Sequence, residues 1–585
     1  MENTRCILPY IIDEQARKYG SRQALSWVNE SGEELASYSY VELAEAVRQT
    51  ARALAGQGLG PGDVCLVFSA NRPEMIITDF ACYANGAIPV SIYATASREQ
   101  VAHIIENSQP KLAFAGAQGQ YDMLASLGGI PKLYAWDGTG PRLDTANAVF
   151  PMDEIERRRA AVTPDDTATL IYTSGTTGHP KAADLPHRCF DAQMRTHRVR
   201  LDMLSDADRS LCFLPLCHIF EKAWTYLCIT LGINIAINQN AKEIAKAVRA
   251  VRPTCMCSVP RFWEKAYALI QEKIAALPAP KRWLARAAVR CGHKRNVKYE
   301  RMGRPAPWLT ERLYRFFDRH FLAPTRRAMG VDQGNIFPTA GAPISPEIVD
   351  FFRSIGVPIF IGYGMSETTA TVTCYPDQAY EIGSVGVAMP GVELRIGLEG
   401  EVQVRGDIVM RGYYRDQEAT SEAFTGDGWL RTGDAGRIDH AGGLVLTERL
   451  KDLFKTSNGK YVAPQAIESR LGADKYIDQV AVVGESRSYV TAIIIPAYEA
   501  LKDYARKKGI AFKSINDLIR NSEIMDMLKR RIDRLQRGLP SFEQIKKFTL
   551  LPSAFTIESG ELTNTLKIRR PVIAANYASV IDSMY

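Results

Sequence analysis

The 585-residue sequence lacks several features that would place it in a common class. Its eleven cysteines include no Cys-x-x-Cys pair, and none lies after Cys374, which indicates unpaired, buried thiols in a reducing compartment. Lys and Arg exceed Asp and Glu by only 7, so the overall charge does not indicate a nucleic-acid-binding protein. The longest apolar tract, 223–237, is too short to span a bilayer, and the N-terminus does not resemble a signal peptide. We therefore expect a cytoplasmic protein.

Length and patterning predict several layered domains rather than one core. Short apolar runs typical of strands occur at 63–69, 168–173, 254–259, 357–362 and 394–396, and most are separated by helical patterns such as 40–54. This alternation predicts an α/β protein with a mostly parallel sheet. We expect a large N-terminal domain of layered α/β subdomains, residues 1–448, which includes a small β-rich part at about 391–448. A small, mobile α+β C-terminal domain, residues 449–585, would follow.

One segment carries an unusual charge. Residues 281–304 contain nine Lys or Arg side chains, and Glu300 is their only acid. Trp283 and Leu284 add apolar content to this segment, and further aromatics follow at 308–321. Two interpretations remain open: a basic amphipathic element on the inner face of a membrane, to which the protein would bind peripherally, or a solvated helical insertion.

The strongest local motif is the segment Tyr172–Lys181, YTSGTTGHPK, which directly follows an expected strand. Its glycines allow several backbone N–H groups to point at one anion, its hydroxyls add donors, and Lys181 adds a positive charge. The segment is not a Walker A loop, because Pro180 and Ala182 flank the lysine where that motif has Gly and Ser or Thr. The segment therefore predicts a polyphosphate site of another kind.

This loop resembles the signature of the acyl-adenylate-forming superfamily, the AMP-binding ligases. Further segments match in the same order: 341–343 (GAP), 362–368 (GYGMSET), 400–406 (GEVQVRG), 428–434 (GWLRTGD), 449–452 (RLKD) and 560–567 (GELTNTLK). Details within 71–95, 215–221 and 259–265 are most similar to long-chain fatty acid:CoA ligases. So many ordered matches make the resemblance specific.

The resemblance implies that a fatty acid reacts with ATP to give acyl-AMP, and that CoA then accepts the acyl group. Lys567 matches the catalytic lysine of the first step, and Glu367 matches the Mg²⁺ ligand. Thr173 and Lys181 would help to hold the pyrophosphate portion of ATP. The implied ATP and AMP contacts are Tyr172, Ser174, Gly175, Thr176, Thr177, Gly178, Lys181, Gly341, Ala342, Pro343, Gly362, Tyr363, Gly364, Ser366, Asp434 and Arg449. Among these, Tyr363 would stack on adenine and Asp434 would accept hydrogen bonds from the ribose.

Other residues would shape the acyl and CoA sites. His218 would line the acyl pocket, although a core histidine is the alternative, and Gly364 would leave room for a long tail where short-chain relatives carry Trp. In this family the small domain rotates between the two steps, with Lys451 at the hinge. After the rotation, Gly459 and Lys460 would approach the pantetheine of CoA.

Three other functions remain open on the sequence alone. In the first, the acceptor is an acyl carrier protein instead of CoA. In the second, the substrate is an aromatic acid or an amino acid, and Glu221 would pair with the ammonium group of the amino acid. The third alternative is a nucleotide-binding protein on a membrane surface without catalytic activity.

Overall fold

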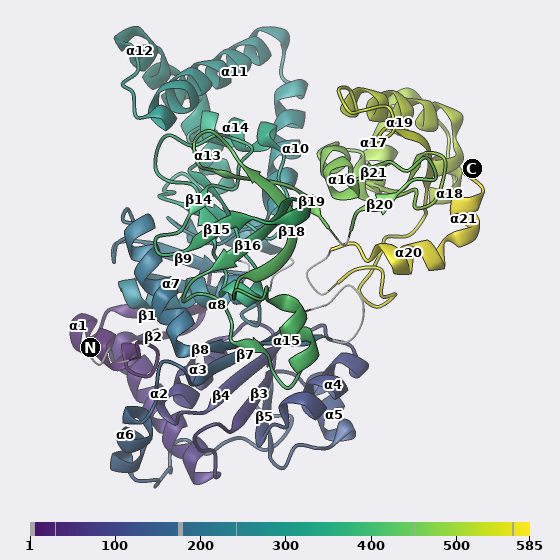
Figure 1. Ribbon diagram of the computed structural model, residues 1–585. Helices are drawn as coiled ribbons and strands as arrows, with labels where there is room; N and C mark the ends of the chain where they lie inside the picture. The colour runs from purple at the N-terminus through teal and green to yellow at the C-terminus, as the bar shows by residue number, and fades with distance from the viewer. Residues whose placement is uncertain (1–5, 30, 174–179, 241–242, 451, 564–566) are drawn as a thin grey trace.

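The computed structural model describes residues 6–29, 31–173, 180–240, 243–450, 452–563 and 567–585 (Figure 1). A large body holds the chain up to about β19 (Leu444–Arg449), and a smaller lobe beside it holds the C-terminal part. The predicted ATP contacts Ser174, Gly175, Thr176, Thr177 and Gly178 and the predicted hinge residue Lys451 lie outside the described residues.

The first sheet of the large body has the order β2-β1-β10-β9, in which β1, β10 and β9 run parallel. Its strands are β1 (Gln23–Val28), β2 (Glu34–Ser39), β9 (Arg209–Cys212) and β10 (Asn234–Asn238). The strand expected at 254–259 forms only isolated parallel bridges, through Cys255 and Ser258. These bridges connect β9 to the next sheet, β11-β12-β13-β14, which consists of β11 (Phe337–Thr339), β12 (Ile359–Tyr363), β13 (Thr373–Cys374) and β14 (Val387–Ala388).

A second, wholly parallel sheet has the order β4-β3-β5-β6. It contains β3 (Val64–Phe68), β4 (Ile88–Ile92), β5 (Leu112–Ala115) and β6 (Leu133–Ala135). Every residue of β3 is buried, as expected for a central strand with helices on both faces. The strand predicted before the segment Tyr172–Lys181 is β7 (Thr167–Thr173). It pairs antiparallel with β8 (Lys181–Pro186), and β17 (Gly412–Tyr413) pairs antiparallel with the other edge of β8. The expectation of a mostly parallel sheet is therefore wrong for this part.

Helices cover these sheets, and local sequence explains where several of them begin. The helix expected at 40–54 is α2 (Tyr40–Gly56), which begins with a capping box: Ser39 Oγ accepts from Glu42 N–H, and the Glu42 carboxylate accepts from Ser39 N–H at 2.8 Å. The other helices of this part are α1 (Ile11–Tyr19), α3 (Pro73–Ala84), α4 (Arg98–Ser108), α5 (Gln118–Leu127), α6 (Met152–Ala160), α7 (His187–Arg200), α8 (Ile219–Leu231), α9 (Ile244–Val251) and α14 (Pro346–Ser354). Ten of the eleven cysteines are buried and all are free, as predicted.

The β-rich subdomain is confirmed as an antiparallel sheet of order β15-β16-β18-β19. Its strands are β15 (Glu393–Ile396), β16 (Glu401–Arg405), β18 (Leu430–Ile438) and β19, and α15 (Gln417–Ala423) lies beside it. This sheet is part of the large body, and β18 and β19 lie on the side of that body next to the C-terminal lobe (Figure 1).

The C-terminal lobe has an α+β fold with its own apolar cores. Its strands are β20 (Phe454–Lys455), β21 (Tyr461–Val462), β22 (Ile477–Val483), β23 (Val490–Pro496) and β24 (Ile545–Leu550). Its helices are α16 (Pro464–Gly472), α17 (Tyr498–Lys508), α18 (Ile515–Arg520), α19 (Ser522–Leu535), α20 (Arg570–Asn576) and α21 (Ala578–Asp582). A separate core allows the lobe to move as a unit.

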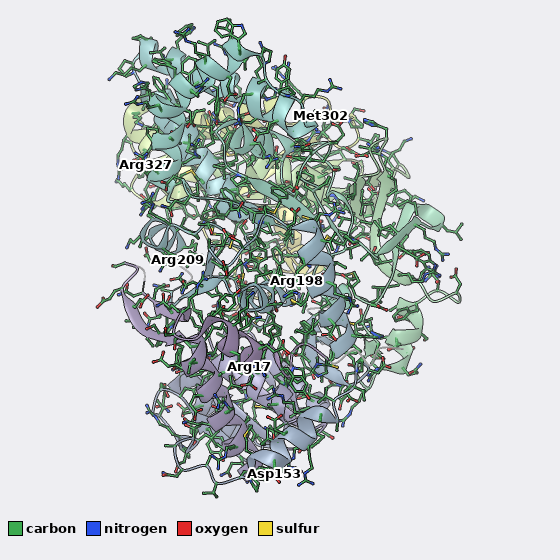
Figure 2. The ribbon with its side chains drawn as sticks, turned by 90° about the vertical axis from the view of Figure 1, so that its left-hand side faces the viewer. Arg17, Asp153, Arg198, Arg209, Met302 and Arg327 are labelled. Atoms are coloured by element: carbon green, nitrogen blue, oxygen red, sulfur yellow. The ribbon has the colours of Figure 1, made fainter. Side chains whose placement is uncertain are left out.

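A helical insertion occupies one end of the large body. It consists of α10 (Pro260–Ala276), α11 (Ala279–Gly292), the π-helical η2 (His293–Tyr299), α12 (Trp308–Phe317), η4 (Asp318–Leu322) and α13 (Ala323–Met329). The rotated view places Met302 and Arg327 near one end of the molecule and Asp153 at the other (Figure 2). Across the described residues, no helix is long and apolar enough to cross a membrane.

Candidate functional site

Several predicted nucleotide contacts converge where β12 ends beside the β-rich sheet. Tyr363 is the last residue of β12, and Glu367 follows in the short helix η5 (Ser366–Thr368). Asp434 and Arg449 lie directly opposite each other in the antiparallel pair β18 and β19. The register of one hairpin and the end of one strand therefore bring these residues together.

Hydrogen bonds join three of these side chains. The Tyr363 hydroxyl donates to Asp434 Oδ2 at 2.6 Å, and Arg449 Nε lies 3.2 Å from Asp434 Oδ1. Burial and the Asp434 carboxylate both raise the pKa of Tyr363, so its hydroxyl remains a donor at neutral pH. The buried Asp434 is thus fixed in orientation while carrying a negative charge beside a cation. This arrangement suits a carboxylate that accepts hydrogen bonds from sugar hydroxyls.

Glu367 takes part in a second group of polar contacts. Its Oε1 accepts a hydrogen bond from the Tyr413 hydroxyl at 2.7 Å, and Lys181 Nζ lies 5.3 Å from the centre of the Tyr413 ring. Among the described residues no three His, Cys, Asp or Glu side chains gather as a metal site. A single buried carboxylate fits Mg²⁺, because this ion usually takes one or two protein carboxylates and completes its shell with phosphate oxygens and water.

Lys567 of the C-terminal lobe faces the same residues. Burial of its amine, followed by the nearby Arg449 cation, lowers the pKa of Lys567 to about 8. Three carboxylates oppose this shift: Asp434, Asp452 and Glu367. By surface area Lys567 as a whole is an exposed residue, so the shift reflects the protein atoms close to its amine and not enclosure of the whole side chain. Both lobes therefore contribute to one site, which presents cations and carboxylates to a common space.

The remaining predicted contacts occupy the surrounding loops. Gly341, Ala342 and Pro343 form an exposed turn after β11, and Gly341 has a φ of +92°. Gly362 lies in β12 and Ser366 begins η5. The Thr173 hydroxyl donates to Lys181 O at 3.2 Å across the β7–β8 hairpin. Tyr172 is engaged elsewhere, because its hydroxyl donates to Asn107 Oδ1 at 2.6 Å.

Gly364 lies against the backbone of a neighbouring turn. A Cβ atom at this position would lie 1.6 Å from the backbone oxygen of Ala370, so any side chain would require the backbone to move. The chain itself, through the turn in which Thr369 and Ala370 have positive φ angles, fills this space. Backbone packing therefore requires a glycine here, and the role of Gly364 in leaving room for an acyl tail stays a prediction.

The start of α8 lies near the Lys567 amine. His218 caps the N-terminus of α8, where its Nδ1 accepts from Phe220 N–H at 3.2 Å. Burial and then the Lys567 cation lower the pKa of His218 to about 4, so it is neutral at physiological pH. One turn further, Glu221 is fully buried and accepts from Leu214 N–H at 3.1 Å, and burial raises its pKa to about 8. A protonated, enclosed Glu221 does not suit recognition of a substrate ammonium.

The predicted CoA residues lie on the β20–β21 hairpin of the C-terminal lobe. Gly459 has a φ of +77°, which the tight turn requires, and Lys460 Nζ lies 6.0 Å from the centre of the Phe542 ring of the same lobe. In this conformation Lys567 faces the predicted nucleotide residues Asp434, Arg449 and Glu367.

Sequence reasoning missed two side chains of this site. Tyr413 holds Glu367 and lies beside Lys181, but 46 residues separate it from Glu367 and no spacing pattern links them. Asp452, next to the predicted hinge, accepts from Gln465 Nε2 at 2.5 Å and contributes to the field at Lys567. Only the charge of the 449–452 segment gave a signal for Asp452.

Comparisons with known proteins agree with this geometry. Residues 12–414 match the family described as AMP-binding enzyme, and residues 451–585 match its C-terminal domain. The long-chain-fatty-acid–CoA ligase FadD15 of Mycobacterium bovis is 35% identical over 558 residues, which are 93% of this chain and 91% of that protein. The long-chain-fatty-acid–CoA ligase 1 of Homo sapiens is 29% identical over 587 residues, which are 94% of this chain and 82% of that protein.

Solved structures share the fold at lower identity. The A domain of a carboxylic acid reductase from Segniliparus rugosus, in complex with AMP and a co-purified carboxylic acid, has a TM-score of 0.75 at 21% identity and covers 100% of this chain and 94% of that one. The o-succinylbenzoate CoA synthetase of Bacillus subtilis, in complex with ATP and magnesium ion, has a TM-score of 0.66 at 19% identity, with 96% and 98% covered. With its fold and both of its parts matched, the chain belongs to the AMP-binding enzyme family.

Proposed function

We propose that this protein is an ATP-dependent long-chain fatty acid:CoA ligase. It converts a fatty acid, ATP and CoA into acyl-CoA, AMP and pyrophosphate by way of acyl-AMP. The observation that carries this proposal is the position of Lys567 opposite Asp434 and Glu367, because it places a cation from the small lobe at a site suited to a nucleotide. The long-chain substrate is supported by the names of the relatives that align with almost the whole chain.

In the first step, a carboxylate oxygen of the fatty acid attacks the α-phosphorus of ATP and pyrophosphate leaves. Negative charge accumulates around the phosphorus, so catalysis depends on position and on electrostatic stabilisation. Lys567 would contact the carboxylate and the α-phosphate, and Asp434 would hold the ribose. Lys181 would bind the departing pyrophosphate. Glu367 would hold Mg²⁺, which supplies positive charge to the phosphates when it is bound.

In the second step, the CoA thiol attacks the acyl carbon and AMP leaves. We propose that the domain 449–585 rotates on the domain 1–448 about Lys451, so that Lys567 withdraws and the hairpin with Gly459 and Lys460 approaches the pantetheine. The separate apolar core of the C-terminal lobe supports this motion as a unit. The proposal includes a cytoplasmic site of action, with peripheral attachment to the inner face of a membrane.

The test is ATP–pyrophosphate exchange with palmitate, acetate, a phenylpropanoid acid and mixed amino acids, followed by addition of CoA to the mixture that reacts. Palmitate is expected to give the strongest exchange and to form a thioester when CoA is added. Exchange without thioester would favour a carrier-protein acceptor. Stronger exchange with an aromatic acid or an amino acid would identify that acid, and not a fatty acid, as the substrate. Absence of exchange with every acid would favour the non-catalytic alternative.

One ion pair between the lobes gives a more specific prediction. Arg261 at the start of α10 donates to Asp478 O at 2.6 Å and also contacts the Asp478 carboxylate at the start of β22. Lys475 Nζ lies 3.6 Å from Glu272 Oε1 beside it. These contacts hold the lobes in the present orientation, and they must break if the lobe rotates.

We therefore expect Arg261→Ala to slow acyl-AMP formation about twofold to fivefold, because a partly exposed ion pair contributes only about 0.5–1 kcal/mol. Thioester formation from supplied acyl-AMP should be unchanged or faster. Single-turnover measurement of each step tests this, with Arg252→Ala as the control, since Arg252 pairs with Asp332 inside the large body. Equal slowing of both steps would argue against a contact that favours one orientation.

A further inference from the structure

The helical insertion presents exposed apolar side chains at the end of the molecule. Of the seven tryptophans, only Trp283 and Trp308 are exposed, to 62% and 73%. Trp308 is followed on α12 by three more exposed apolar residues, Leu309, Leu313 and Phe316. We call the surface formed by the exposed residues of α11, η2, α12 and η4 the insertion face.

Helical periodicity gathers these residues into stripes. Leu309, Leu313 and Phe316 follow the spacing of one side of α12. On α11, Trp283 shares one side with Arg286 and Arg290. The two helices pack against each other at the same end of the molecule (Figure 1). The insertion face therefore places apolar side chains next to cations.

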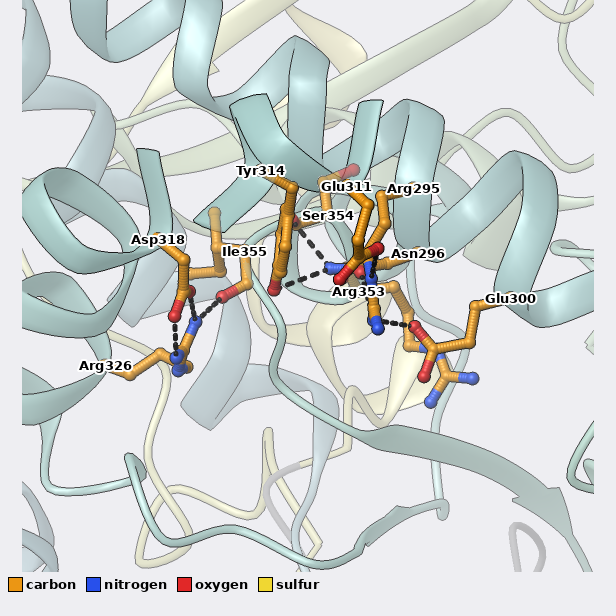
Figure 3. Close-up of polar contacts among 10 residues, drawn as sticks. All are labelled: Arg295, Asn296, Glu300, Glu311, Tyr314, Asp318, Arg326, Arg353, Ser354 and Ile355. Atoms are coloured by element: carbon orange, nitrogen blue, oxygen red, sulfur yellow. Dashed lines mark hydrogen bonds and ion pairs between the residues drawn. The ribbon is translucent and has the colours of Figure 1, made fainter. Parts of the chain in front are cut away.

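The basic residues of the helical insertion from α11 to α13 include two groups. Those that point inward are paired. Figure 3 shows Arg295 with Glu300 and Glu311, and Arg326 with Asp318. Arg301 pairs with Glu381. The other group has no ion pair within the described part of the chain: Lys281, Arg282, Arg286, Arg290, Lys294, Lys298, Arg304, Arg312, Arg315 and Arg319. The insertion face thus carries unneutralised positive charge, which favours an anionic partner.

The inward contacts fix the insertion to the large body. Asn296 Nδ2 donates to the backbone oxygens of Arg353 and Ser354, at 3.1 and 3.2 Å, and Arg326 donates to Ile355 O at 2.7 Å (Figure 3). Gly292 makes a close approach, because a Cβ there would lie 2.0 Å from Ser354 O. The insertion face is therefore presented by a braced element, at a fixed position relative to α14.

We infer that the insertion face docks on an anionic lipid bilayer. Lys and Arg attract acidic headgroups, while Trp, Leu and Phe gain free energy by entering the interface. A nucleic acid would use the cations and leave the apolar stripe exposed to water, so the observations favour lipid. The inference rests on the proposed function only for its purpose, because a fatty acid partitions into membranes.

The insertion is also linked to the site. Helix α10 begins at Pro260, where the buried Trp263 donates to Ser258 Oγ and Thr339 Oγ1 at 2.8 and 2.9 Å, and it ends next to α11. One helix of 17 residues, about 25 Å long, therefore connects the strands that carry the site to the insertion face. Docking would hold one end of α10 near the bilayer, while its other end stays bound to Thr339 of β11.

Co-sedimentation with vesicles tests this without ATP, CoA or fatty acid, so its outcome is independent of the proposed function. We expect the protein to sediment with phosphatidylcholine vesicles that contain about 30% phosphatidylserine at about 50 mM salt, and to be released at about 500 mM salt. Arg286→Glu with Arg290→Glu should weaken binding at least tenfold, since each basic residue near such a surface contributes about fivefold. Leu309→Ser, Leu313→Ser and Phe316→Ser together should also weaken it about tenfold.

Matched variants on other surfaces serve as controls. Val149→Ser with Leu398→Ser removes exposed apolar residues, and Arg142→Glu with Arg437→Glu reverses exposed charges, so both should sediment like the unmodified protein. Thermal unfolding checks that every variant is folded. Failure of the unmodified protein to sediment would overturn the inference, as would equal binding by all variants. A dimer in solution that the serine variant abolishes, without vesicle binding, would assign the face to a second copy of the chain instead.

Discussion

Replacing Lys567 by alanine is expected to reduce acyl-AMP formation by about 10²–10³-fold while leaving thioester formation from supplied palmitoyl-AMP within about threefold. The physical reason is that the Lys567 amine lies among Asp434, Asp452 and Glu367, where the carboxylate and the α-phosphate would meet. In the proposed second step the lobe would have rotated, and this amine would have left the site. Single-turnover assays of each step measure the two effects separately.

Lys460→Ala is the matched control, because it removes another lysine of the same lobe. It should have little effect on acyl-AMP formation and should slow the thioester step, since Lys460 would approach the pantetheine only after rotation. If Lys567→Ala impaired both steps equally, the assignment of this residue to the first step alone would be wrong.

The pH profile of the first step tests the same residue. Because burial and Arg449 lower the pKa of Lys567 to about 8, raising the pH through this value removes its positive charge. The kcat/KM of exchange, which reports the free enzyme, should therefore fall above about pH 8. In Lys567→Arg this alkaline decrease should disappear, even if the overall rate is lower, because a guanidinium stays protonated. An unchanged decrease in the arginine variant would assign it to another group.

Replacing Glu367 by glutamine is expected to have the second largest effect, a reduction of acyl-AMP formation by about 10²-fold and a higher Mg²⁺ requirement. Glutamine keeps the shape of the side chain and an oxygen that can accept from Tyr413, so the change isolates the lost negative charge. The measurement is exchange rate as a function of Mg²⁺ concentration.

Tyr413→Phe is the control for Glu367, because it removes the hydrogen bond and keeps the carboxylate. We expect a smaller decrease, about threefold to tenfold, with little change in the Mg²⁺ requirement. The same Mg²⁺ dependence in Glu367→Gln and the unmodified protein would contradict the role of Glu367 as the metal ligand.

The fold was predictable where local pattern suffices. The buried run of β3, the capping box of α2 and the β-rich sheet near residue 400 all follow from residues close in sequence. Strand direction did not follow, because an apolar run such as β7 carries no information on whether its partner runs parallel or antiparallel. The segment around Cys255 bridges its neighbours only at isolated points, which depends on how two sheets meet.

The site likewise contains residues that the sequence predicts and residues whose contacts depend on tertiary packing. Motif order identified Asp434 and Arg449, and their contact then follows from the register of one hairpin. Tyr413 was not predictable, since its contact with Glu367 depends on the folding of distant segments. Resemblance predicts a role for Gly364 in tail length, and its local geometry adds a close approach of the Ala370 backbone, which no sequence pattern indicates. Resemblance thus identified positions, and packing determined what they contact.

The most direct measurement of the central claim follows oxygen from the fatty acid. Palmitate labelled with ¹⁸O in its carboxylate is incubated with the enzyme, ATP, Mg²⁺ and CoA, and the products are analysed by mass spectrometry. If the carboxylate attacks the α-phosphorus, one labelled oxygen must appear in AMP for each palmitoyl-CoA formed, and none in pyrophosphate. Label in pyrophosphate or inorganic phosphate, or unlabelled AMP alongside palmitoyl-CoA, would contradict activation through acyl-AMP.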